Sequence, residues 1–320
     1  MMTMKWLKRI GYTAVILFAL LNMMAAFHAW KFTHFYTAGV KVKSPDEMGF
    51  IDKASAILFG VTYPKSIITD SLDAPHVTVH FVTDDSMKLE AWYLTHAVDS
   101  LHPHKGTILI FHGHASSRSG VIRETEEFYH LGYDVLSTDF RAHGNSEGNT
   151  CTIGWNEIKD VKAAYNFVEE KGEKHIVLYG ISLGAASILR AVHEYTLTPE
   201  KVILEMPFAT LENAVEGRVK MMGLPAEPIS TLLTFWGGTE NGFWAFGFKP
   251  VEYAHSIQCD ALLQWGINDP RVTEAETDSI YAHISSAKKK LVKYTNSGHQ
   301  SLCKKEYEKW MQEIISFLEN

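Results

Sequence analysis

Short apolar runs recur along the chain from residue 107 onward and predict the strands of a sheet. Continuous apolar segments occupy 107–111, 135–138, 176–179, 202–204 and 261–265. Runs without polar alternation are typical of strands covered on both faces, as in a parallel sheet. Segments 77–82 and 88–93 instead alternate with period two around a polar turn, which predicts an antiparallel hairpin at a sheet edge.

Apolar residues at helical spacing lie between these runs. One such face covers 158–168, a capping box at 273–276 opens a second helix, and 302–318 keeps its apolar residues on one side. Strands that alternate with helices predict an α/β fold with a doubly wound, mostly parallel sheet. The segment 207–258 interrupts this alternation with aromatic residues, methionines, glycines and prolines, and we interpret it as a small helical lid.

The N-terminus carries a different pattern. Residues 10–27 form an 18-residue stretch without a charge, preceded by Lys8 and Arg9 and followed by aromatic residues. We interpret it as an uncleaved signal anchor with a cytoplasmic N-terminus, which places the rest of the chain outside the cytoplasm. A cleaved signal peptide, giving a secreted protein, and a buried core helix are the alternatives. The predicted division is an anchor with flanks at 1–36, a linker that packs on the domain at 37–75, and an α/β domain at 76–320.

Composition narrows the classes of function. The 320-residue chain is 46% hydrophobic, with a net charge of −7 and a pI near 6.1, so it lacks the basic surface of a nucleic-acid-binding protein. Its three cysteines are too scattered for a disulfide framework. Apart from a small-molecule substrate, the sequence indicates one partner, the lipid bilayer. No pattern indicates an oligomeric state.

Candidate chemistry centres on the segment 176–186, where a buried-strand pattern, a G-x-S-x-G pentapeptide and a helix opening follow one another. This layout predicts a nucleophile elbow, a sharp turn that presents the hydroxyl of Ser182 above the sheet. A second G-x-S-x-G contains Ser146 but lacks a helical pattern behind it, so we expect Ser146 to have no catalytic role.

A serine hydroxyl needs a base and a carboxylate that orients the base, and the expected chain order is serine, acid, histidine. Asp269 follows the strand at 261–265, and His299 lies in the loop before the last helix. Both fall at carboxyl ends of strands, where open α/β sheets carry their sites. Glu205, at the end of an earlier strand, is the rival acid.

A tetrahedral intermediate also needs donors for its oxyanion. We expect these to be the backbone N–H groups of Leu183 and His114, with Gly113 allowing a close approach of the backbone. His112 and His114 also raise the possibility of a metal pair, but no acidic or cysteine ligands accompany them. The sequence therefore predicts neither a metal nor an organic cofactor.

Taken together, His112-Gly113, the segment 139–148, Gly180 to Gly184, Asn268-Asp269 and Gly298-His299 resemble the α/β-hydrolase superfamily. The branch most similar is the serine aminopeptidase and monoacylglycerol-lipase-like group, with its membrane-anchored esterase relatives. In that group the strand before the acid usually ends in His-Gly, whereas here it reads Trp265-Gly266. The resemblance implies that the segment 141–146 supports the site loops without catalytic groups.

These patterns predict a membrane-anchored serine hydrolase that cleaves carboxylic esters of small-molecule substrates, with an apolar acyl group favoured, through an acyl-enzyme. A serine peptidase or a thioesterase is the alternative within enzymes. The peptidase would need a lid carboxylate to bind the substrate amine, for which the sequence offers Glu212, Glu216, Glu227 and Glu240. An inactive binding module on the same fold is the alternative outside enzymes.

Overall fold

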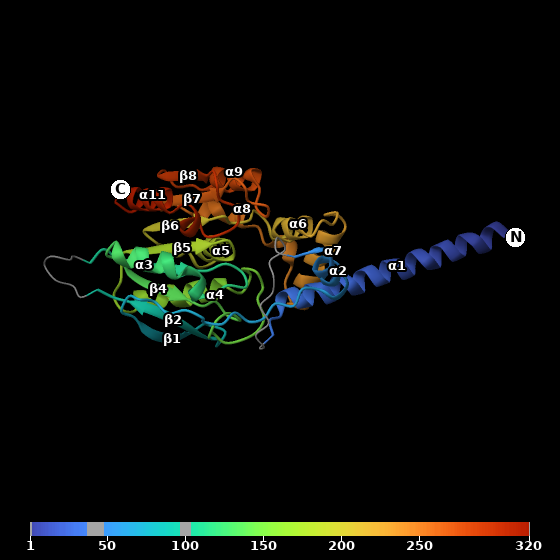
Figure 1. The fold of residues 1–320 in the computed structure, drawn as a ribbon, viewed down its shortest axis with the longest axis horizontal. Helices are drawn as coiled ribbons and strands as arrows, with labels where there is room; N and C mark the ends of the chain where they lie inside the picture. Colours follow the sequence, from blue (N-terminus) through green and yellow to red (C-terminus); the bar gives the residue numbers. More distant parts are fainter. Residues whose placement is uncertain (1, 37–47, 97–103, 320) are drawn as a thin grey trace.

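The computed structural model describes residues 2–36, 48–96 and 104–319, and its centre is an eight-stranded sheet (Figure 1). Its order is β1-β2-β4-β3-β5-β6-β7-β8. β1 and β2 form the antiparallel hairpin, β2 pairs antiparallel with β4, and the other neighbours are parallel. The predicted α/β fold is therefore confirmed. The strands are β1 (Val77–Val82), β2 (Lys88–Leu94), β3 (Thr107–Phe111), β4 (Asp134–Thr138), β5 (Ile176–Ile181), β6 (Lys201–Glu205), β7 (Asp260–Gly266) and β8 (Lys289–Tyr294).

Helices cover both faces of this sheet. Adjacent strand residues point to opposite faces, so the apolar strands present side chains on both faces that the helices bury. In β5, the ring of Tyr179 contacts Phe128 of α3, whereas Gly180 lies against Ala185 of α5. Phe128 also contacts Trp310 of α11. One layer therefore contains α3 (Ile122–His130), α10 (Leu302–Lys305) and α11 (Tyr307–Leu318), and the other contains α4 (Ile158–Glu169), α5 (Leu183–Tyr195), α8 (Pro250–Tyr253) and α9 (Glu274–His283).

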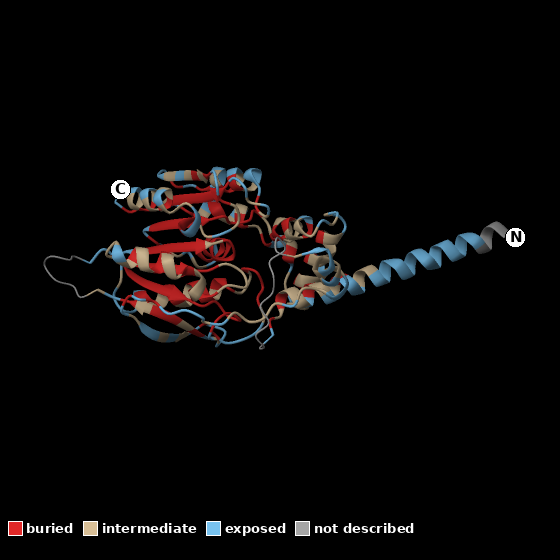
Figure 2. Cartoon of the chain, in the orientation of Figure 1, coloured by how far each residue is buried: buried red, intermediate tan, exposed pale blue. Residues whose placement is uncertain are grey.

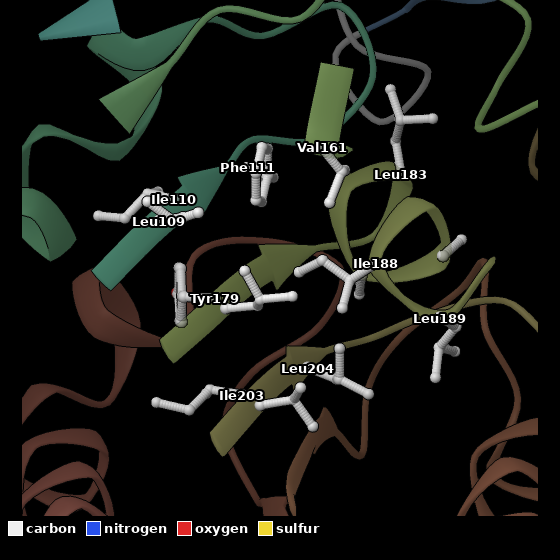
Figure 3. Packing of buried hydrophobic residues seen from close by; sticks show 14 of the residues in the cluster. Leu109, Ile110, Phe111, Val161, Tyr179, Leu183, Ile188, Leu189, Ile203 and Leu204 are labelled. Atoms are coloured by element: carbon white, nitrogen blue, oxygen red, sulfur yellow. The ribbon is translucent and has the colours of Figure 1, made fainter. Parts of the chain in front are cut away.

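The core lies between the sheet and these two layers (Figure 2). Leu109, Tyr179 and Leu204 come from the neighbouring strands β3, β5 and β6 and are fully buried, as is Ile188 of α5 (Figure 3). All five residues of β3 are buried, as are all five of β6. Burying each large apolar side chain contributes about 1.5–3 kcal/mol to folding, and this packing holds the strand ends in fixed positions beneath the site.

The single helix expected at 302–318 is wrong in one respect, because the structure breaks it at Glu306. Glu306 has non-helical backbone angles (φ −130°, ψ 59°), and its carboxylate accepts hydrogen bonds from the backbone N–H of Asn296 and the hydroxyl of Ser297. These bonds tie the start of α11 to the loop that carries His299. Apolar spacing could not reveal the break, since the residues on either side keep the same face buried.

The N-terminal helix α1 (Met2–Thr33) projects from the domain, and its residues 6–20 are exposed (Figures 1 and 2). Its second half packs against a group of helices outside the sheet, above all α7, where the Trp236 indole N–H donates to the Asn22 side-chain oxygen at 3.1 Å. That group contains α2 (Phe50–Phe59), α6 (Leu211–Met221) and α7 (Ile229–Glu240).

The expected lid segment 207–258 is helical in the structure, with two short 3₁₀ turns at Ala245–Gly247 and Ala254–Ser256. Of the expected linker, residues 37–47 lie outside the described residues. Its later part contains α2 and an extended segment in which Lys65 donates its backbone N–H to the Tyr36 carbonyl at 2.8 Å. The domain limits themselves stay predictions.

Candidate active site

The turn between β5 and α5 places Ser182 in a strained conformation. Its φ of 52° and ψ of −107° lie outside the regions that L-residues ordinarily adopt. The flanking glycines are required by contact: a Cβ on Gly180 would lie 2.6 Å from the Ala185 nitrogen, and one on Gly184 would lie 2.1 Å from the Phe111 carbonyl oxygen. Ser182 thus begins α5 with its side chain held at the end of the strand.

Parallel register brings the other loops to the same edge. Phe111 of β3 pairs with Gly180 of β5, so the loop that follows β3 runs beside the elbow. Its Gly113 lies against Ser182, since a Cβ there would be 3.9 Å from the serine Cβ. The loops after β7 and β8, which carry Asp269 and His299, reach this edge as well.

Three of the predicted side chains form a continuous hydrogen-bonded chain. His299 Nδ1 lies 2.7 Å from Asp269 Oδ2, and His299 Nε2 lies 2.9 Å from the Ser182 hydroxyl oxygen. Because a carboxylate only accepts hydrogen bonds, Nδ1 carries the imidazole proton and Nε2 is free to accept from the serine. Arg271 and Val272 fix the acid by donating their backbone N–H groups to its other oxygen at 2.7 and 3.0 Å.

Burial sets the protonation state of the imidazole. The His299 side chain is 8% exposed and that of Asp269 fully buried. Burial lowers the pKa of His299 below its ordinary value of 6.5, against the opposing effect of Asp269. The positive charges of Arg271 and Arg218 lower this pKa further. The imidazole is therefore neutral at pH 7, which is the form that accepts a proton.

The two backbone N–H groups expected to stabilise an oxyanion belong to Leu183 and His114. Leu183 is the first residue of α5, so its N–H has no partner within the helix. His114 follows Gly113, and the next residue, Ala115, has a positive φ of 55°. The Ala115 N–H donates to Nε2 of the buried His143 at 3.2 Å, which fixes the loop. The sequence motif around 141–146 did not by itself reveal this contact.

The rival residues lie in other networks. Ser146 donates its hydroxyl to the Asp139 carbonyl at 2.6 Å and accepts the Glu90 N–H at 2.9 Å, so it braces two strand ends. Glu205 is fully buried and accepts hydrogen bonds from the Tyr179 hydroxyl at 2.8 Å and the Trp310 indole at 2.7 Å. Burial raises the pKa of Glu205 to about 8.

His112 is also occupied by backbone groups. It donates from Nδ1 to the Gly113 carbonyl at 2.7 Å and accepts the Phe140 N–H at Nε2, at 3.2 Å. Within the described ranges, no group of three or more His, Cys, Asp or Glu side chains is arranged to hold a metal ion.

A cavity of about 890 Å³ reaches the loop after β3 from the side of α1. Its wall combines residues from the second half of α1, from α2, α6 and α7, and His114 and Ala115 of the loop; Ser182 and His299 are not part of the wall. Most of the wall is apolar, and its charged side chains among the described residues are those of Lys65, Arg218 and Arg271. Sequence reasoning missed both arginines, because neither belongs to a motif.

Comparisons with known proteins agree with this architecture. The model of the family "Serine aminopeptidase, S33" matches residues 102–236. Esterase Pf2001 of Pyrococcus furiosus has the same fold, with a TM-score of 0.66 and 23% identity over 90% of this chain and 97% of that chain. The chain therefore has the α/β-hydrolase fold. Over residues 102–236 its sequence resembles the S33 family.

Two curated relatives are similar in sequence. The lysophosphatidylserine lipase ABHD12 of Bos taurus is 27% identical over 58% of this chain and 46% of its own length. The membrane protein YNL320W of Saccharomyces cerevisiae is 28% identical over 46% of this chain and 50% of its own length. The chain thus spans about half the length of these two relatives. Its helix α1 is long and apolar enough to be a membrane anchor or a signal segment.

Proposed function

We propose that this α/β-hydrolase is a membrane-anchored serine esterase that cleaves lipid-like carboxylic esters through an acyl-enzyme. The observation that carries the proposal is the hydrogen-bonded chain from Asp269 through His299 to Ser182. This arrangement activates an otherwise weak nucleophile, because the imidazole takes the serine proton as the oxygen attacks.

In the first half of the reaction, the Ser182 oxygen attacks the ester carbonyl carbon while its proton passes to Nε2 of His299. The N–H groups of Leu183 and His114 stabilise the negative oxygen that forms. The C–O bond to the alcohol then breaks, and His299 returns the proton to the leaving alcohol. In the second half, water attacks the acyl-enzyme by the same route and releases the carboxylic acid. Asp269 keeps Nδ1 of His299 protonated throughout.

The position of α1 favours a substrate drawn from a bilayer. The charge-free residues 10–27 rise about 27 Å as a helix, close to the ~30 Å hydrocarbon thickness of a membrane. The last part of this stretch belongs to the wall of the cavity, which is lined by Leu21, Met24 and Ala25. If α1 spans a membrane, the apolar cavity therefore opens at the level of the lipid. The relative from Bos taurus is itself described as a lipase acting on lysophosphatidylserine.

The composition of the cavity wall disfavours an aminopeptidase. Recognition of a substrate amine requires a carboxylate, yet the described residues of the wall include no Asp or Glu. Two of the four lid glutamates are engaged elsewhere: Glu216 pairs with Lys220 at 2.6 Å, and Glu227 accepts hydrogen bonds from Ser230 and Thr231. An ester with an apolar acyl group suits this wall better.

Labelling with a fluorophosphonate tests whether the serine is activated. We expect the full-length protein to be labelled and Ser182→Ala to remain unlabelled, with Ser146→Ala as the matched control that keeps the label. Absence of label on the parent protein would favour an inactive binding module. Hydrolysis of p-nitrophenyl esters beside aminoacyl amides separates esterase from peptidase, and faster cleavage of the amides would overturn the ester assignment.

A further inference from the structure

The end of the cavity next to the site carries two arginines from different elements. Arg218 belongs to α6, and Arg271 follows two residues after Asp269. Gly217 seats α6 on the acid loop, because a Cβ there would lie 2.4 Å from the Arg271 carbonyl oxygen. Both side chains line the cavity. Burial lowers the pKa of Arg218 from 12.5 to about 10, and repulsion by Arg271 adds to this effect, so that Arg218 stays positive at pH 7.

Neither guanidinium has an acidic partner within the part of the chain that the structure describes. Arg218 donates one hydrogen bond, to the Ala214 carbonyl at 2.9 Å, and lies over the ring of Phe32 at 5.0 Å. The Arg271 Nε atom is buried and has no hydrogen-bond partner. Arginines in buried settings elsewhere in this chain are paired: Arg118 with Asp139, and Arg141 with Asp160.

The neighbouring carboxylate of Asp269 attracts Arg218 but forms no ion pair with either guanidinium among the described residues. Asp269 already accepts three hydrogen bonds, from His299 and from two backbone N–H groups. Two like charges and an unsatisfied guanidinium N–H in a mostly apolar cavity are unfavourable by themselves, and a bound anion removes that penalty.

We infer that Arg218 and Arg271 bind the anionic group of the substrate, a phosphate or a carboxylate, while its acyl chain occupies the apolar part of the cavity. The inference rests on the proposed function and specifies its substrate class: esters of anionic single-chain amphiphiles. An anion held beside Asp269 and His299 places the adjoining ester next to Ser182. Two guanidiniums match the oxygens of either anion, so phosphate and carboxylate must be separated by experiment.

Matched substrates test the inference on the full-length protein. The three probes share one acyl chain: 1-lauroylglycerol, 1-lauroylglycerol 3-phosphate, and 3-O-lauroylglycerate, which carries a carboxylate. We expect at least one anionic ester to exceed the neutral ester in kcat/KM. Arg271→Met and Arg218→Met should each reduce that ratio by about 10- to 100-fold, as expected for the loss of a charge-assisted contact.

Lys220→Met is the control, because Lys220 is an exposed cation on the same helix and pairs with Glu216. It should leave the ratio unchanged. Preference for the phosphate ester alone, or the carboxylate ester alone, identifies the anion. No anionic preference in the parent, or a preference that survives both arginine substitutions, overturns the inference.

A binding measurement separates this result from the esterase proposal. Dodecyl phosphate or dodecanoate, below the critical micelle concentration, should raise the melting temperature of Ser182→Ala, and dodecyltrimethylammonium should not. The same measurement needs no arginine variant, so it decides the matter if those variants fail to fold. Equal shifts with anionic and cationic amphiphiles refute the anion site. If the parent protein hydrolyses no ester but Ser182→Ala keeps the anion-specific shift, only the esterase proposal is refuted.

Discussion

Replacing Asp269 with Asn tests the proposed proton relay with almost no change in shape. The Asp269 Oδ1 atom accepts two backbone N–H groups, those of Arg271 and Val272, and Oδ2 accepts the Nδ1–H of His299. An asparagine has only one carbonyl oxygen for these two positions. Turning its amide nitrogen toward the backbone would leave two buried donors unsatisfied, at roughly 1–3 kcal/mol each.

The favoured orientation therefore presents the amide N–H₂ to His299. Nδ1 must then become the acceptor, which moves the imidazole proton to Nε2, where it faces Ser182. A protonated Nε2 cannot take the serine proton. We expect kcat to fall by about 10⁴, equivalent to about 5.5 kcal/mol of transition-state stabilisation, with stability changed by only about 1 kcal/mol.

The assay is hydrolysis of a p-nitrophenyl ester by the parent, Asp269→Asn and Glu205→Gln, with urea unfolding of each. Burial raises the pKa of Glu205 to about 8, so its carboxyl is mostly protonated at pH 7 and an amide replaces it closely. Glu205→Gln should keep most of the activity. An Asp269→Asn variant that retains more than about a tenth of parental kcat would refute the reasoning, and loss confined to Glu205→Gln would make that residue the acid.

Three further predictions follow from the same geometry. The rate of neutral-ester hydrolysis should rise with pH through an apparent pKa below 6.5, because burial lowers the pKa of His299. Arg271→Met should shift this rise to higher pH, because it removes a positive charge that lowers the same pKa. An unchanged pH profile would contradict the electrostatic influence of Arg271 on His299. Gly184→Ala should destabilise the fold by about 3 kcal/mol or more in urea unfolding, since its Cβ would lie 2.1 Å from the Phe111 carbonyl oxygen, and parental stability would count against the elbow geometry. Deletion of residues 2–20 should release the protein from membranes with its hydrolysis of soluble esters retained, because the described wall of the cavity begins at Leu21; cell fractionation and the ester assay check both parts, and a truncated protein that stays in the membrane fraction would show that α1 is not the anchor.

Local pattern in the sequence was enough to predict the sheet and the elbow. Buried strands appear as uninterrupted apolar runs, and a glycine on each side of Ser182 marks a turn that tolerates no Cβ at either place. The rule that open α/β sheets carry their sites at the carboxyl ends of strands then singled out Asp269 and His299 from many other acids and histidines. The break at Glu306 was not predicted, because it depends on hydrogen bonds to a loop about ten residues away.

Only the tertiary structure decided what surrounds those residues. Arg218 and Arg271 are unremarkable as sequence, since one lies within a lid helix and the other follows a turn, and their adjacency arises because Gly217 lets α6 rest on the acid loop. The composition of residues 10–27 predicts a membrane-type helix, but it does not predict that the second half of α1 forms a wall of the cavity. Chain patterns record periodicity and local backbone limits, whereas charge pairing and cavity walls depend on distances between segments that are remote along the chain.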